Sequence, residues 1–176
     1  MRTWHPVQNK TRGILLAALL AVAAALTVGC NDDPPLTEVE RFMASLGHLD
    51  DGAYIDTLRA LTDDPLPTRL YAHYELGNVF YSMAVDTAME RGWQDPRSVT
   101  LLDSTRHYFE RAVAIDSTYV PALVNLGSYW GDMAQNLSLG RAQRKERDTR
   151  LKNSERLYLQ ALRHAPEDET ARCNLG

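Results

Sequence analysis

Few side chains in this sequence have the types and the spacing that catalysis or metal binding requires. The sequence contains no phosphate-binding glycine loop, no dinucleotide-binding glycine motif, and no HExxH or CxxC motif. Its five histidines are scattered, and His48 with Asp50 could supply two metal ligands but lacks the further ligands of a zinc site. No serine lies in a nucleophile-elbow motif. We therefore expect no catalytic residue, no cofactor and no metal, and we expect that the protein is not an enzyme.

The two thiols, Cys30 and Cys173, lie in different sequence surroundings. Cys30 follows Leu-Thr-Val-Gly at the end of an apolar run, whereas Cys173 lies in a segment predicted to be helical. Because free cysteine is commonly a small buried residue, we expect Cys173 to be buried rather than reactive. The two cysteines are expected to have separate roles, so no disulfide framework is predicted.

The first 29 residues have the layout of an export signal. Arg2, Lys10 and Arg12 form a positive segment, and an uncharged, mostly apolar run follows from residue 13 to residue 29. A membrane-spanning helix needs about 20 apolar residues, so this run is short for a permanent anchor. We predict a signal peptide over residues 1–29, followed by an acidic, proline-containing tether over residues 30–36.

The end of this leader resembles the lipobox of bacterial lipoproteins, with the small Gly29 directly before Cys30. Thr27 departs from the leucine that is usual in that motif. The resemblance implies cleavage before Cys30 and acylation of its thiol, for example with palmitate, which would anchor the chain to a membrane. Asn31, directly after Cys30, favours a location of the protein at the outer membrane, facing the periplasm. The alternatives are the inner membrane, a secreted protein whose signal merely contains a cysteine, or an uncleaved anchor.

Three leucine-glycine pairs divide the remaining chain into units. Gly77, Gly127 and Gly176 each follow a leucine, with spacings of 50 and then 49 residues. A fixed period of this size is typical of stacked repeats. We predict a helical hairpin over residues 37–66, repeats over 68–119 and 120–168, and the start of a further repeat over 169–176.

Apolar spacing within the two full repeats predicts helices and no strand. The predicted helices cover residues 68–90, 98–115, 120–139 and 144–164, with Pro166 following the last one. The side chains expected to face inward are Leu102, Tyr108, Phe109, Ala112, Val113, Leu123, Leu126, Tyr129, Trp130, Met133, Leu151, Leu157, Tyr158, Ala161 and Leu162.

These units resemble tetratricopeptide repeats (TPRs). The resemblance rests on Leu76-Gly77-x-x-Phe80 and Leu126-Gly127-x-x-Trp130 in the first helices, and on Phe109-x-x-Ala112 and Tyr158-x-x-Ala161 in the second helices. It implies an all-α fold of antiparallel helix hairpins stacked in a right-handed superhelix. The family period is about 34 residues, so about 15 extra residues per unit must lengthen both helices by about two turns or form loops. A generic helical bundle is the rival fold.

The resemblance also implies a binding surface, because in this family the concave side of the first helices holds peptides or partner helices. Asparagine can donate and accept hydrogen bonds at once, and tyrosine offers rigid contact area with a polar tip. The alternative is that some of these tyrosines belong to the core. The residues at the matched positions are Tyr71, Tyr74, Asn78, Tyr81, Val124, Asn125, Ser128, Asp132 and Asn174.

Charge argues against nucleic acid as a partner. The net charge is −4, and removing the three positive charges of the leader leaves −7, whereas nucleic-acid proteins carry a basic face. One local exception is the run over residues 141–152, which holds six basic and two acidic residues. A solvated helix face is favoured for this run, and a patch for acidic lipid or a partner is the alternative.

Together these features predict a non-catalytic scaffold or adaptor that binds other envelope proteins and is attached to the membrane by its N-terminal lipid. No nucleic acid and no small-molecule substrate are expected. One alternative is an accessory or regulatory subunit of an envelope enzyme. The other is the N-terminal fragment of a larger protein whose catalytic part lies beyond residue 176.

Overall fold

A computed structural model describes residues 37–136 and 141–175, apart from the side chains of residues 38–40, 141 and 142. Every regular element in these residues is helical and none is a strand, which confirms the predicted all-α class. The chain divides into two compact units, one ending at Thr57 and the other running from Leu58 to Gly176. The predicted leader and tether, including Cys30, lie outside the described residues.

The first unit contains α2 (Glu38–Ser45), η2 (Leu46–His48) and most of α3 (Asp51–Ala60). Asp50 precedes α3, and its Oδ1 accepts a hydrogen bond of 2.9 Å from the backbone N–H of Ala53. Asp50 is therefore an N-terminal cap, because its side-chain oxygen satisfies an N–H that the helix itself cannot. The Nδ1 of His48 lies 2.7 Å from the carbonyl oxygen of Ser45. His48 and Asp50 are therefore each engaged with their own backbone.

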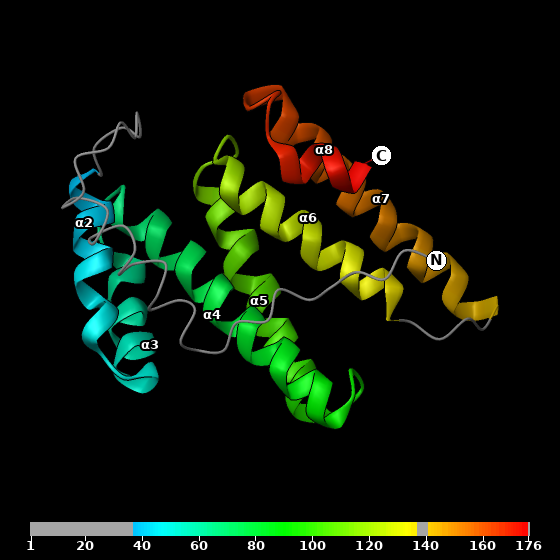
Figure 1. Cartoon of the computed structure of the whole chain (residues 1–176), viewed down its shortest axis with the longest axis horizontal. Coiled ribbons are helices and arrows are strands. Elements are labelled where there is room, and N and C mark those ends of the chain that lie inside the picture. Colours follow the sequence, from blue (N-terminus) through cyan, green and yellow to red (C-terminus); the bar gives the residue numbers. More distant parts are fainter. Residues whose placement is uncertain (1–36, 137–140, 176) are drawn as a thin grey trace, which may run out of the picture. The chain divides into compact units, whose positions relative to one another are not determined.

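The second unit is built from two long hairpins and a short final helix (Figure 1). The helix α4 packs mainly against α5, and α6 packs mainly against α7. Smaller contacts join α5 to α6, α7 to α8 and α6 to α8. The bounds are η3 (Leu61–Asp63), α4 (Thr68–Arg91), α5 (Pro96–Ile115), α6 (Val120–Gln135), α7 (Arg141–His164) and α8 (Glu169–Leu175).

The long period of the sequence is accommodated within the helices. The helices α4 and α7 have 24 residues each and α5 has 20, all well above the average of about 11–12. The helix predicted over residues 120–139 is shorter than expected, because α6 ends at Gln135. There the amide Nδ2 of Asn136 donates a 2.7 Å hydrogen bond to the backbone oxygen of Asp132, a local bond that competes with another helical turn.

Each hairpin is closed by a glycine against an aromatic ring. A Cβ added at Gly77 would lie 2.3 Å from Cδ1 of Phe109, and one added at Gly127 would lie 2.9 Å from Cε1 of Tyr158. Both distances are shorter than a normal carbon contact of about 3.5–4.0 Å, so only glycine lets the paired helices approach this closely. Gly127 therefore lies where two helices touch, and the equivalent contact at Gly77 makes the arrangement repeat-like.

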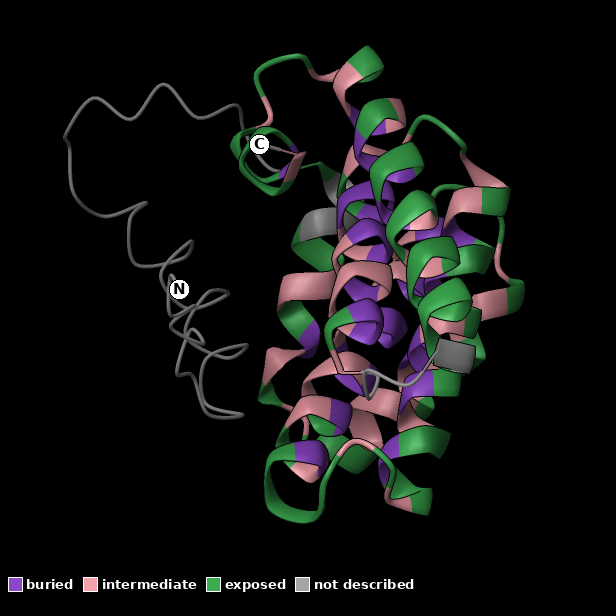
Figure 2. Cartoon of the chain, turned by 90° about the vertical axis from the view of Figure 1, so that its right-hand side faces the viewer, coloured by how far each residue is buried: buried purple, intermediate pink, exposed green. Residues whose placement is uncertain are grey.

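Buried side chains lie on the inner faces of the helices, and exposed ones cover the outer faces (Figure 2). Ala72, Ala122 and Ala171, each five residues before one of the repeat glycines, are all 0% exposed. The buried hydroxyl of Ser154 donates a 2.7 Å hydrogen bond to the carbonyl of Gly127, and that of Thr105 donates to Leu101 at 2.9 Å. These bonds explain how hydroxyl side chains are tolerated inside the second helices.

Three predicted placements are wrong. Leu151 is 40% exposed, because the neighbouring Arg150 faces α6 instead and donates to the carbonyl of Met133 at 3.1 Å. Cys173 is exposed, since α8 turns Ala171 and Leu175 toward the core and a residue midway between them points outward. Val124, expected on the binding surface, is only 7% exposed and belongs to the main core.

Candidate functional site

Polar side chains from consecutive repeats meet between α4 and α6. The amide Nδ2 of Asn125 donates hydrogen bonds to Oδ1 of Asn78 at 2.8 Å and to the hydroxyl of Tyr74 at 3.2 Å. Asn78 follows the repeat glycine of its helix, and Asn125 lies two residues before the next one. The two asparagines, 47 residues apart in sequence, therefore form the joint between two repeats.

The next joint, from α6 to α8, uses the equivalent backbone positions with different side chains. The hydroxyl of Ser128 lies 2.9 Å from that of Tyr158, and Nδ2 of Asn174 donates to the same Tyr158 hydroxyl at 2.9 Å. Ser128 is shorter than the asparagine at its equivalent position, so a tyrosine hydroxyl bridges the gap. In the first hairpin the ring at this place belongs to Phe109, which has no hydroxyl to offer.

A third polar contact joins α4 to α6 one turn further along. The hydroxyl of Tyr81 donates a hydrogen bond to Oδ2 of Asp132. Burial raises the pKa of the Asp132 carboxyl, and the bond from Tyr81 partly opposes that rise. Burial, together with the negative charge of Asp132, raises the pKa of Tyr81, so its hydroxyl keeps its proton and remains the donor.

We call these eight residues the polar seam. They lie on α4, α6, α7 and α8, and all of their hydrogen bonds described above run between different helices. The members are Tyr74, Asn78, Tyr81, Asn125, Ser128, Asp132, Tyr158 and Asn174.

The seam continues into an aromatic group at one end. The ring of Tyr119, in the connection between α5 and α6, makes edge contacts with Tyr74 at 5.4 Å and with Tyr71 at 5.8 Å between centroids. Such contacts hold aromatic rings in fixed orientations. Beside them lies Glu75, whose pKa is raised by burial and lowered in part by hydrogen bonding from Asn78. This end of the surface is therefore rigid, aromatic and partly acidic.

The internal bonds leave two acceptor oxygens for a ligand, one on Asn125 and one on Asp132. Both hydrogen bonds of Asn125 use its amide nitrogen, and the one side-chain bond of Asp132 uses Oδ2. Within the described part of the chain, Oδ1 of Asn125 and Oδ1 of Asp132 have no hydrogen-bond partner. The seam has no lysine or arginine among its members, so a group that fits it should bring N–H donors.

The structure brings together eight of the nine predicted binding residues, the exception being the buried Val124. Tyr74, Asn78, Tyr81, Asn125, Ser128, Asp132 and Asn174 are seam members, and Tyr71 joins them through Tyr119. Sequence reasoning missed the hydroxyl of Tyr158, which was expected only as a core ring. The sequence feature that could have revealed this role is the replacement of phenylalanine at position 109 by tyrosine at the matched position 158.

The remaining candidates are placed more simply. The basic run of α7 has exposed side chains at Arg144, Lys145 and Arg147, which is the solvated face favoured from the sequence. A cavity of about 240 Å³ is lined by Trp93, Tyr129 and other residues, and is smaller than typical ligand pockets of about 300–1,000 Å³.

The described residues hold neither a candidate metal site nor a candidate membrane span. No group of three or more histidine, cysteine, aspartate or glutamate side chains there could hold a metal ion. None of the helices in residues 37–136 and 141–175 combines the length and apolarity needed to cross a bilayer. Comparison with known proteins found no matching family model, no matching curated protein and no matching solved structure.

Proposed function

We propose that this protein is a non-catalytic scaffold of the TPR type that binds an extended peptide or helix of a partner protein along the polar seam. The observation that supports it is the gathering of amide, hydroxyl and carboxylate groups from α4, α6 and α8 into one hydrogen-bonded row. A row fixed by its own bonds loses little conformational entropy when a partner binds, which favours recognition.

The chemistry of the seam favours a partner that donates hydrogen bonds. The carbonyl oxygen of Asn125 and the second carboxylate oxygen of Asp132 are acceptors, and burial strengthens an electrostatic contact at Asp132. Backbone N–H groups of an extended segment, or a lysine or arginine side chain, would satisfy them. A partner presenting carboxylates would instead meet like charge and is disfavoured.

We place this scaffold at the bacterial envelope, attached through a lipid on Cys30, most simply at the outer membrane facing the periplasm. The support is the leader of residues 1–29 and the lipobox-like residues before Cys30. A lipid anchor would restrict the seam to partners within reach of one membrane surface. Partners would then be other envelope proteins.

A triple alanine variant at Tyr74, Asn78 and Asn125 tests the seam. Each lost hydrogen bond should weaken binding by about 0.5–1.5 kcal/mol and loss of the tyrosine contact by more. The measurement is recovery of partner proteins from detergent-solubilised membranes, after circular dichroism has shown that the helices are retained. Replacing Asp132 by asparagine should weaken a cationic partner without removing contact area.

The matched control replaces Thr100, Asp103 and Glu110 on the exposed face of α5 by alanine. Partner recovery should survive in this control and fail in the seam variant. If the seam variant remains folded and still recovers its partner proteins in full, the seam is excluded as the binding site. Recovery lost only on neutralising Arg144, Lys145 and Arg147 would move the site to the basic run of α7.

A further inference from the structure

Four basic side chains lie near one another on the first long hairpin, since the charges of three of them act on the fourth, His73. Arg69 and His73 lie one turn apart on α4, and His107 and Arg111 lie one turn apart on α5, so each pair shares one face of its helix. The helices run antiparallel, and the ring of His73 lies 5.9 Å from that of Tyr108, the neighbour of His107. We call these four residues the basic cluster.

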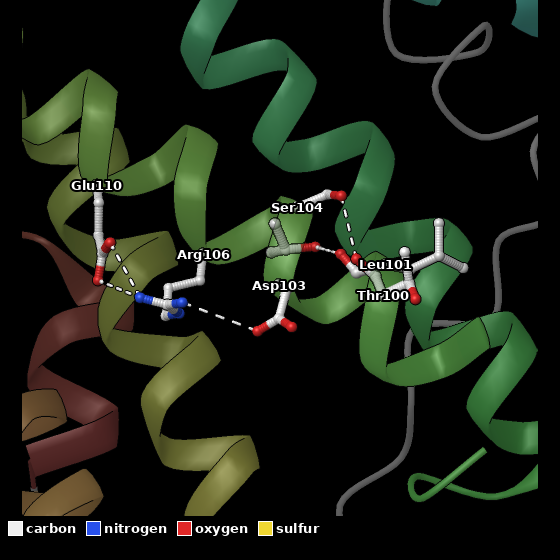
Figure 3. A network of polar contacts seen from close by, with 7 residues as sticks. Thr100, Leu101, Asp103, Ser104, Arg106 and Glu110 are labelled. Carbon is white, nitrogen blue, oxygen red and sulfur yellow. Dashed lines mark hydrogen bonds and ion pairs between the residues drawn. The ribbon is translucent and has the colours of Figure 1, made fainter. Parts of the chain in front are cut away.

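The positive charge of the basic cluster is not neutralised by ion pairs. In the part of the chain that the structure describes, neither Arg69 nor Arg111 has a carboxylate within 4.0 Å, whereas Arg106, Arg150 and Arg172 each have one or more. Figure 3 shows the contrast on the same helix, where Arg106 is held between Asp103 and Glu110. Two guanidinium groups that act on the same histidine and have no ion pair are unexpected in a chain of net charge −4.

The basic cluster also contains buried polar atoms with no hydrogen-bond partner. His73 is only 6% exposed and its Nδ1 makes no hydrogen bond, and Nε of Arg69 is likewise buried and unbonded. Burial lowers the pKa of His73, and the charges of Arg111, His107 and Arg69 lower it further, while Asp63 on η3 acts in the opposite direction. An unsatisfied buried polar group is costly and is rarely kept without a reason.

We propose that the basic cluster binds a tetrahedral oxyanion of the phosphate or sulfate type. Guanidinium groups match the oxygen spacing of such an anion, and each imidazole adds one N–H donor. A dianion would balance the two arginines and would favour protonation of His73. Arg69 lies nine residues before Asn78, about 180° around α4, so this site is separate from the polar seam.

The test is an anion titration of the full chain in a non-ionic detergent, followed by NMR signals of the histidine rings. Sodium sulfate and sodium phosphate are added at constant ionic strength, with chloride as the comparison. The signals of His73 and His107 should shift in a saturable manner with sulfate and phosphate and stay in place with chloride. Since sulfate remains divalent, its binding should tighten as the pH is lowered through about 6.5, the usual pKa of histidine.

Variants separate a site from general attraction. Replacing Arg111 by glutamine should weaken sulfate binding by about tenfold or more, because one charge-assisted bidentate contact is lost. The matched control, Arg91→Gln, removes an exposed arginine from the far end of α4 and should leave the affinity unchanged. Circular dichroism of both variants shows whether the helices are retained, and neither change touches the core.

Several results would overturn the proposal. Shifts that rise linearly without saturation, or that chloride reproduces, would identify an adventitious ion only. An equal loss of affinity in Arg111→Gln and Arg91→Gln would do the same. If the site binds, a short-chain phosphatidic acid in the same detergent identifies the source. Displacement of sulfate at a lower concentration of this lipid than of free phosphate assigns a lipid headgroup, and displacement at a lower concentration of free phosphate assigns the soluble ion.

Discussion

Replacing Gly77 by alanine tests the close approach of α4 to α5. The added Cβ would lie 2.3 Å from Phe109, so one group must move by more than about 1 Å to reach a normal contact. Phe109 is 0% exposed and has no free space to move into. Overpacking of this severity costs about 3 kcal/mol, and the better helix propensity of alanine returns about 1 kcal/mol. The expected net loss in free energy of unfolding is about 2 kcal/mol.

The same substitution at two other glycines provides an internal scale. At Gly127 the added Cβ would lie 2.9 Å from Tyr158, so overpacking and helix propensity should nearly cancel, to within about 1 kcal/mol. At Gly131 the nearest atom is the hydroxyl oxygen of Ser154 at 3.4 Å. Alanine there should therefore raise the free energy of unfolding by about 0.5–1 kcal/mol. Leucine at Gly127 should cost roughly 1–3 kcal/mol.

Urea unfolding followed by far-ultraviolet circular dichroism measures these differences. The midpoints should rise in the order Gly77→Ala, Gly127→Ala, Gly131→Ala, with unchanged dependence on urea concentration. If Gly77→Ala unfolds at the same urea concentration as Gly131→Ala, the helices do not touch at Gly77. The reasoning about the repeat contact would then be wrong.

Three further outcomes are expected. Cys30→Ser should abolish incorporation of labelled palmitate and leave an unprocessed or soluble exported protein, and equal labelling of both proteins would exclude the lipid anchor. Tyr158→Phe removes the hydroxyl that joins α6 to α8 and should lower the free energy of unfolding by about 0.5–1.5 kcal/mol, measured by urea unfolding. Tyr108→Phe, whose hydroxyl makes no hydrogen bond within the described chain, should not. His73 has a lowered pKa, so below pH 6.5 the unfolded chain takes up a proton that the folded chain resists. Stability in anion-free buffer should therefore be full above about pH 6.5 and fall as the pH drops below it, and His73→Gln should flatten this dependence in urea unfolding across that range.

The helices and their repetition could be predicted because they depend on local patterns. The spacing of Gly77, Gly127 and Gly176 and the apolar periodicity each reflect contacts that every repeat makes again. The end of α6 could not be predicted, since the side chain of Asn136 bonds back to the helix in a way that sequence spacing does not reveal. The exposure of Leu151 could not be predicted either, because the neighbouring Arg150 faces α6 in its stead and donates a hydrogen bond to a backbone carbonyl there.

The candidate site was predictable as a set of residues and not as a network. Matching each repeat to the next identified Asn78, Asn125 and Asn174 by position. Which of them bond to each other depends on the register of helices 47 residues apart, and that register is set by the whole core. A residue predicted to be free for a ligand can therefore spend part of its hydrogen-bonding capacity on a neighbouring repeat.

The two repeat joints show how such a protein can change in evolution. One joint combines asparagine at position 78 with phenylalanine at 109, and the other combines serine at 128 with tyrosine at 158. Each combination spans the same gap between helices. A substitution at one position of a joint should therefore be accompanied by a substitution at the other. Asn78→Ser alone removes one of the two hydrogen bonds of Asn125, and Phe109→Tyr alone adds a hydroxyl where asparagine already fills the gap. Related sequences should therefore show paired substitutions at these positions, because the second substitution compensates for a first one that is destabilising by itself.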